Sequence, residues 1–161
     1  MFTHHGPRLL LLSLLMGSLL LAGPSTQQAT EATGDSPLVV AVKNHDLRTL
    51  QVLLSYGSDP NQVDAQGVTA LWQAVKEGVP QLQRCLLEFG AAAGPAGETV
   101  RLPLFAAIEA EDIDSVRLLL LYGADPNHPS RKGVSPLMAA VSKKLSEVSQ
   151  LLLERGAAAK P

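Results

Sequence analysis

The feature of this 161-residue chain that most constrains its fold is a pattern that returns every 33 positions. A leucine, an alanine, a Leu-Leu pair and a glycine each occur four times in the same register. These positions are Leu38, Leu71, Leu104 and Leu137; Ala41, Ala74, Ala107 and Ala140; Leu53-Leu54, Leu86-Leu87, Leu119-Leu120 and Leu152-Leu153; Gly57, Gly90, Gly123 and Gly156. A fixed period of this length predicts a solenoid, which usually presents a surface for holding a partner rather than a pocket for chemistry.

The sequence of each unit predicts two short helices followed by a turn, as the first unit illustrates. The Ser-Pro pair at 36–37 suits the N-cap and first position of a helix that carries the apolar run 38–42. A second helix is expected over 47–56, where leucines recur on one face. Gly57 should end this helix in a left-handed conformation, and the Asp-Pro-Asn sequence at 59–61 predicts a turn.

The third and fourth units repeat this layout, with first helices that open on Pro103-Leu104 and on Ser135-Pro136-Leu137. The layout resembles the ankyrin repeat, which has the same period and a first helix that begins T-P-L-H-x-A. The resemblance covers residues 34–158, with repeats at about 34–66, 67–99, 100–132 and 133–158. It implies an all-α solenoid of four helix-turn-helix units with projecting β-turn loops.

The chain departs from the ankyrin pattern at the motif histidine. Val39, Trp72, Phe105 and Met138 occupy that position. The family's buried Thr–His hydrogen-bond network therefore does not carry over, and apolar packing is expected in its place.

The second unit also departs from the pattern, in its loop. Ala92 and Gly94 replace the Asp and Asn of the other turns, and Leu102 replaces the Ser or Thr that caps the other first helices. Loss of an N-cap costs about 1 kcal/mol. We predict that the junction between units 2 and 3 is the least stable point of the stack, with weaker hydrogen-exchange protection at 91–102 than at 58–69.

Residues 1–25 have the layout of a secretory signal peptide. Arg8 precedes an apolar run at 9–22, and small residues follow at 23–25. The run is shorter than the roughly 20 residues that a transmembrane helix needs. This predicts a secreted or luminal protein, with 26–33 as a flexible linker. The alternatives are an uncleaved membrane anchor, or a cytosolic protein in which this segment is a helix docked on the first repeat.

The sequence indicates no catalytic, cofactor-binding or metal-binding site. The single cysteine, Cys85, occupies a repeat position that is otherwise apolar, so we expect a buried thiol. No nucleophile–histidine set, phosphate-binding glycine loop or calcium-loop spacing occurs. Solvated surface positions are expected for His45 and His128 and for an acidic group: Glu109, Glu111, Asp112 and Asp114. The chain is therefore predicted not to be an enzyme.

The partner is predicted to be a protein. A net charge of −2 and the lack of a basic stripe with interleaved aromatics argue against nucleic acid, and a membrane is expected only if residues 1–25 stay attached. In the ankyrin resemblance, partners contact the loop tips and the concave helix face. Those positions are Lys43, Asn44, Gln66, Val68, Lys76, Glu77, Glu98, Arg101, Glu109, Arg131, Lys132, Val134 and Lys143.

We expect a monomeric, non-enzymatic interaction module with a mixed-charge contact surface. The alternatives are a membrane-anchored or cytosolic ankyrin regulatory protein, or a non-catalytic subunit of an enzyme complex. The last helix is expected to cap the stack with a polar outer face: Lys143, Lys144, Ser146, Glu147, Ser149, Gln150, Glu154 and Arg155.

Overall fold

The computed structural model describes residues 34–95 and 101–158. The chain divides into units at 1–34 and 35–161, and the second unit carries all the helices named in the following paragraphs. The predicted signal peptide, the predicted linker, Glu98 and Val100 lie outside the described residues.

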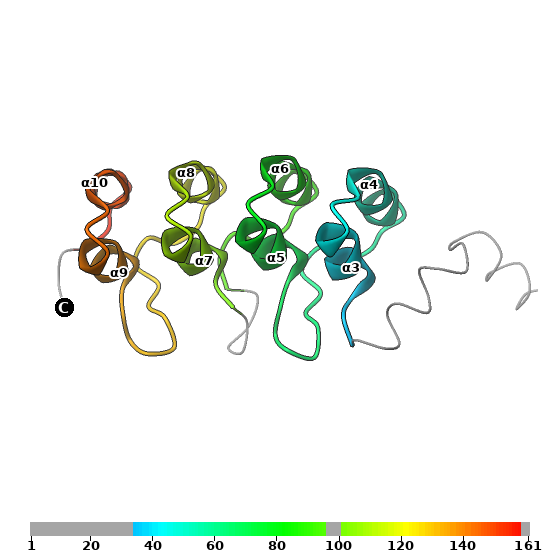
Figure 1. Ribbon diagram of the computed structural model, residues 1–161, viewed down its shortest axis with the longest axis horizontal. Helices are drawn as coiled ribbons and strands as arrows, with labels where there is room; N and C mark the ends of the chain where they lie inside the picture. The colour runs from blue at the N-terminus through cyan, green and yellow to red at the C-terminus, as the bar shows by residue number, and fades with distance from the viewer. Residues whose placement is uncertain (1–33, 96–100, 159–161) are drawn as a thin grey trace, which may run out of the picture. The chain divides into compact units, whose positions relative to one another are not determined.

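Eight helices of the described chain form four pairs, and each pair repeats the previous one 33 residues later. The first helices form one layer, the second helices form another, and the longer loops project beside the first helices (Figure 1). The pairs are α3 (Pro37–Lys43) with α4 (Leu47–Ser55), α5 (Ala70–Lys76) with α6 (Pro80–Glu88), α7 (Pro103–Glu109) with α8 (Ile113–Leu121), and α9 (Pro136–Ser142) with α10 (Ser146–Glu154). The all-α ankyrin-like solenoid predicted from the period is confirmed.

The first helices begin where side chains satisfy free backbone N–H groups. The Oγ atoms of Ser36, Thr69 and Ser135 accept hydrogen bonds from the backbone N–H three residues later, at 3.1–3.3 Å. Leu102 provides no such bond to α7, as its side chain predicts. On α4, Asp46 takes this role, and hydrogen bonds from the hydroxyl and the N–H of Thr49 lower the pKa of its carboxyl.

The second helices end as predicted, at glycines with a left-handed backbone. Gly57, Gly90, Gly123 and Gly156 have φ between 86° and 89°. A second left-handed residue occurs in the turn inside each unit, where the sequence indicated no such conformation. In unit 2 this residue is Gly78. In units 1, 3 and 4 it is His45, Glu111 and Lys144, whose φ angles lie between 53° and 60°. A left-handed conformation is uncommon for residues other than glycine, so the packed helix pair holds these three in place.

A continuous core runs through the stack between the two helix layers. Its largest fully buried side chains include Leu50, Leu86, Leu119 and Leu152. The motif-histidine position behaves differently along the stack. Val39 is fully buried, but Met138 is 46% exposed, so the expectation of apolar packing at all four positions is wrong in the last unit.

The outer side of the last unit is less polar than predicted. Val141 and Leu153 are exposed there, among the expected polar residues. Their counterparts one unit earlier, Ile108 and Leu120, are buried. The difference follows from position, because the following unit covers this side of a helix pair in the first three units.

Cys85 is the chain's one cysteine, and it lies 5% exposed in the core, as predicted. Burial, and secondly the charge of Glu88, raise the pKa of its thiol above the usual 9.0. Since the thiolate is the reactive form, we expect a maleimide to modify the native protein far more slowly than the urea-unfolded chain. The pKa of this thiol is higher in the folded chain than in the unfolded chain, where it is about 9.0. The contribution of the thiol to the free energy of unfolding is therefore fully present below pH 9.0 and is lost as the pH rises through the folded-state pKa.

Mass spectrometry over a time course of maleimide treatment measures this difference. Equal rates for native and unfolded chains would contradict the buried position of Cys85.

Asparagine side chains connect neighbouring loops at two of the three junctions between units. Asn61 Nδ2 donates to the Gly90 carbonyl at 3.3 Å, and its Oδ1 accepts from the Ala92 N–H at 2.7 Å. Asn127 makes the same two bonds to Gly156 and Ala158, at 3.0 and 2.7 Å. Gly94 stands at the equivalent place between units 2 and 3 and has no side chain to make them.

Other bonds hold the junction between units 2 and 3. The Arg101 N–H donates to the Gly67 carbonyl at 3.1 Å. Deeper in the stack, Ser115 Oγ of unit 3 lies 2.9 Å from Gln83 Oε1 of unit 2, and Gln83 Nε2 donates to the Ala74 carbonyl within unit 2. Units 2 and 3 therefore stay joined, but without the pair of asparagine hydrogen bonds found at the other two junctions, which we call the asparagine clip.

Candidate interaction surface

The candidate surface, named the first-helix face, is the exposed side of α3, α5, α7 and α9 together with the loops between units. Lys43, Lys76 and Glu109 close α3, α5 and α7, and Lys143 follows α9. These residues fall on successive first helices at the same or a neighbouring repeat position. The structure therefore arranges them along one side of the stack, as the repeat pattern predicts.

Most of the predicted contact residues are exposed to solvent on this face. The exposed ones are Lys43, Asn44, Gln66, Lys76, Glu77, Arg101, Glu109, Arg131, Lys132 and Lys143. Val134 is half-buried, and Glu98 lies outside the described residues.

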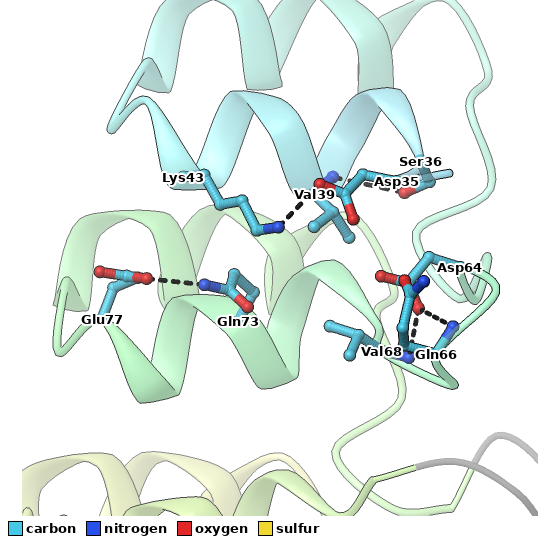
Figure 2. A network of polar contacts seen from close by, with 9 residues as sticks. All are labelled: Asp35, Ser36, Val39, Lys43, Asp64, Gln66, Val68, Gln73 and Glu77. Carbon is cyan, nitrogen blue, oxygen red and sulfur yellow. Dashed lines mark hydrogen bonds and ion pairs between the residues drawn. The ribbon is translucent and has the colours of Figure 1, made fainter. Parts of the chain in front are cut away.

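Val68 is a correction, because only 7% of its surface is exposed. Its N–H donates to Asp64 Oδ1 at 2.8 Å, and its carbonyl accepts from the Asp64 N–H at 3.0 Å. The same carboxylate oxygen accepts from the Gln66 N–H at 2.9 Å (Figure 2). Asp64 thus folds the loop back on itself, which turns Val68 into the core and leaves Gln66 outside.

Several charged residues of the first-helix face are already paired within the chain. Lys43 Nζ lies 2.7 Å from Asp35 Oδ2 (Figure 2). Lys143 Nζ donates to Glu111 Oε1 and to the Glu109 carbonyl, both at 3.2 Å. Exposed ion pairs of this kind contribute about 0–1 kcal/mol to stability, so they mainly orient side chains. The sequence suggested the charges but did not show which of them pair.

One feature that sequence reasoning missed is a cluster around Trp72. Lys76 Nζ lies 5.4 Å from the centroid of the Trp72 ring, and Arg101 Cζ lies 4.9 Å from it. Lys76 follows Trp72 by four residues on α5, a spacing that places both on one helix face and could have indicated this contact. Arg101 comes from the next unit, so only the stacking of the units brings it to the ring.

The residues with ionisable or metal-binding side chains occupy ordinary structural positions. Glu109, Glu111 and Asp114 are exposed as expected, whereas Asp112 is half-buried because it caps α8 through the Ser115 N–H. His45 is exposed and His128 is half-buried. Within residues 34–95 and 101–158, no group of three or more His, Cys, Asp or Glu side chains is placed to hold a metal ion.

The helices are also too short or too polar to cross a lipid bilayer in the part of the chain that the structure describes.

A stack of paired helices with one exposed row of first helices and loops defines a repeat solenoid with an extended contact face. The family model for ankyrin repeats matches the chain three times, at residues 13–95, 38–130 and 99–160. The second match alone covers more than half of the chain. The chain therefore belongs to the ankyrin-repeat family.

The chain is also similar to several curated proteins. It is 31% identical over 147 residues to the B-cell lymphoma 3 protein homolog of Mus musculus, covering 88% of this chain and 33% of that protein. It is 34% identical over 118 residues to ankyrin repeat and SOCS box protein 11 of Mus musculus, covering 73% and 36%. It is 30% identical over 135 residues to the E3 ubiquitin-protein ligase KEG of Arabidopsis thaliana, covering 82% and 8%.

The chain thus spans about a third or less of the length of these relatives.

Proposed function

We propose that this chain is a non-enzymatic protein-interaction module that binds a protein partner across its first-helix face. Ankyrin repeats are generally protein–protein interaction modules, and the chain has this fold. The observation that carries the proposal is the row of exposed polar and charged side chains on successive first helices and loops. A solenoid displays such residues at regular intervals, which suits a long contact with another protein.

The proposal includes a monomeric chain and a partner other than nucleic acid. The net charge of −2 gives no long-range attraction for a polyanion. Acidic and basic side chains are interspersed along the face, with Glu77 and Glu109 following Lys76, with Arg131 and Lys132 at the end of the third unit, and with Lys143 in the last unit. This pattern fits a protein surface of mixed charge.

Charge reversal tests the contact face. In one variant, Arg131, Lys132 and Lys143 are all changed to glutamate. In a matched control, the exposed arginines of the second helices, Arg48, Arg84 and Arg117, receive the same change. Both variants change the net charge equally, so a difference between them reports where the charges lie.

Partners are cross-linked to each full-length protein in its own cell type and quantified by mass spectrometry. We expect the first variant to lose specific partners about tenfold and the control to keep them. Equal partner sets for both variants and the unmodified chain, with unchanged thermal unfolding, would refute this face as the contact surface.

We also propose that residues 1–25 direct the protein into the secretory pathway and are then removed. The support is the sequence itself, with Arg8 before the apolar run at 9–22 and small residues at 23–25. N-terminal sequencing of the protein from its own cells, combined with fractionation, tests this. A start near residue 26 in the lumen or medium would agree with the proposal, whereas an intact Met1 in the cytosol would overturn it.

A further inference from the structure

The cluster of Trp72, Lys76 and Arg101 stands out on the first-helix face because it gathers two cations on one aromatic ring. The main chain at Arg101 is held in place, since its N–H donates to the Gly67 carbonyl of the preceding loop at 3.1 Å. The Arg101 and Lys76 charges lie 4.9 and 5.4 Å from the same ring centroid. Both side chains are exposed, and the Trp72 indole is half-buried.

Three carboxylates of the first two units have other partners. Asp35 pairs with Lys43, and Asp64 accepts two backbone N–H groups of its own loop. Glu77 accepts from Gln73 Nε2 at 2.6 Å (Figure 2). Among residues 34–95 and 101–158, the salt bridges involve neither Lys76 nor Arg101. Two positive charges are therefore held within about 10 Å of each other, near the Debye length in cells, on a half-buried ring.

We propose that this cluster is the anchor for an acidic side chain of the partner protein. The Arg101 guanidinium can hold a carboxylate through two parallel N–H donors, and the Lys76 ammonium adds a second charge. The exposed edge of Trp72 gives the apolar part of the same segment a surface to lie on. This inference rests on the proposed function, because it names the chemistry that the interaction face recognises.

The surroundings limit the partner to a short acidic stretch. Glu77 is exposed directly after Lys76, and Glu109 is exposed at the end of α7 on the same face, so both would repel a longer run of carboxylates. Nucleic acid binding relies on several phosphate contacts at once, which two cations beside these acids do not supply. The segment recognised is therefore one or two acidic residues flanked by neutral or basic ones.

A second feature suggests how the segment continues along the face. Met138 occupies the repeat position of Trp72 two units later and is 46% exposed. Neighbouring helices pack about 10 Å apart, so the two side chains are separated by about 20 Å along the stack. An extended chain covers this distance in about six residues. An apolar residue about six positions from the acid would reach Met138.

The only tryptophan of the chain lies in the cluster, so its fluorescence reports directly on this site. A random peptide library displayed on phage is first selected against the full-length protein. One enriched peptide is then synthesised without tryptophan, together with a copy in which glutamine and asparagine replace its acidic residues. Both peptides are titrated while the Trp72 emission is recorded.

We expect the selection to enrich acidic residues and the acidic peptide to give a saturable change in emission that weakens as salt is added. The neutral copy should bind at least about tenfold more weakly. The double variant Lys76→Gln and Arg101→Gln should lose binding to a similar degree, whereas Arg48→Gln with Arg84→Gln, two exposed arginines of the second helices, should bind normally. The conservative variant Lys76→Arg, which keeps both charges and the Arg101 guanidinium, should retain most of the affinity, which separates loss of charge from loss of folding.

Enrichment of apolar or basic peptides, equal binding of the neutral copy, or tighter binding of a single-stranded oligonucleotide would overturn the proposal. So would cellular partners that remain bound when Lys76 and Arg101 are changed to glutamine. That last result would leave the proposed function intact. Failure of the proposed function itself would appear differently, because the set of bound partners would then stay the same after every substitution on the first-helix face.

Discussion

Leu119→Ala should lower the free energy of unfolding by about 3 kcal/mol, a loss typical of a fully buried leucine. Leu119 is fully buried on α8, in the middle of the core that runs through the stack. Truncation removes apolar contacts and leaves a cavity that neighbouring helices fill only in part. Small domains are stable by only about 5–15 kcal/mol, so this loss is a large part of the total.

The same helix offers a matched control. Leu121 lies two residues further on and is 69% exposed. Leu121→Ala should change the free energy of unfolding by no more than about 0.5 kcal/mol. Urea unfolding followed by far-ultraviolet circular dichroism measures both variants. Similar losses for the two would show that the core does not lie between the two helix layers.

Asn127→Ala should lower the free energy of unfolding by about 2 kcal/mol, because it removes two hydrogen bonds of about 1 kcal/mol each between the last two loops. The reverse change, Gly94→Asn, should raise it by about 2 kcal/mol by supplying the same two bonds between units 2 and 3. Gly94 suits this change because its φ is not left-handed and an added Cβ would meet no atom within 4 Å.

A control separates the clip from the general effect of removing a glycine. Gly94→Ala also restricts the unfolded chain, which stabilises by about 0.4–1 kcal/mol, but it cannot bridge the loops. Denaturant unfolding should therefore rank asparagine above alanine at residue 94. Equal stabilities would mean that the Gly123 and Asp125 backbone is not within reach of the new side chain.

Native-state hydrogen exchange then locates the effect along the chain. In the unmodified protein, the amides at 91–102 should be less protected than those at 58–69, because Leu102 does not cap α7 and Gly94 has no side chain to bond the next loop. The Ala92 N–H, which donates to Asn61 Oδ1, is the exception. Gly94→Asn should reduce that difference. Stronger protection at 91–102 in the unmodified chain would contradict a weak junction between units 2 and 3.

The repeat pattern predicted the helices well because each unit carries its own local signals. The first helices begin at Pro37, Ala70, Pro103 and Pro136, which keeps the spacing of 33 seen in the leucines. Capping residues and closing glycines act within a few residues of themselves, so their effects can be recognised without knowing the fold. Leu102 illustrates this, since the missing cap on α7 was predicted from its side chain alone.

The interaction face was predicted less well, because equal repeat positions do not share one environment. Val68, Arg101 and Val134 are equivalent in the period, yet the first is buried, the second is exposed and the third is half-buried. The carboxylate of Asp64 decides the first case by folding its loop inward. The loop residues predict a turn, but which side chain the turn faces inward depends on these bonds.

By itself, the sequence determined the number of units, their helices, the buried leucines and the missing cap on α7, because all of these depend on short-range periodicity and capping. Only the tertiary structure decided which side chains of different units meet. Arg101 reaches Trp72, Lys143 reaches Glu111, and Asn127 clips Gly156 because stacking brings together residues 29 to 32 positions apart. The contact face is built from such pairs, so its chemistry emerges when the units pack against one another.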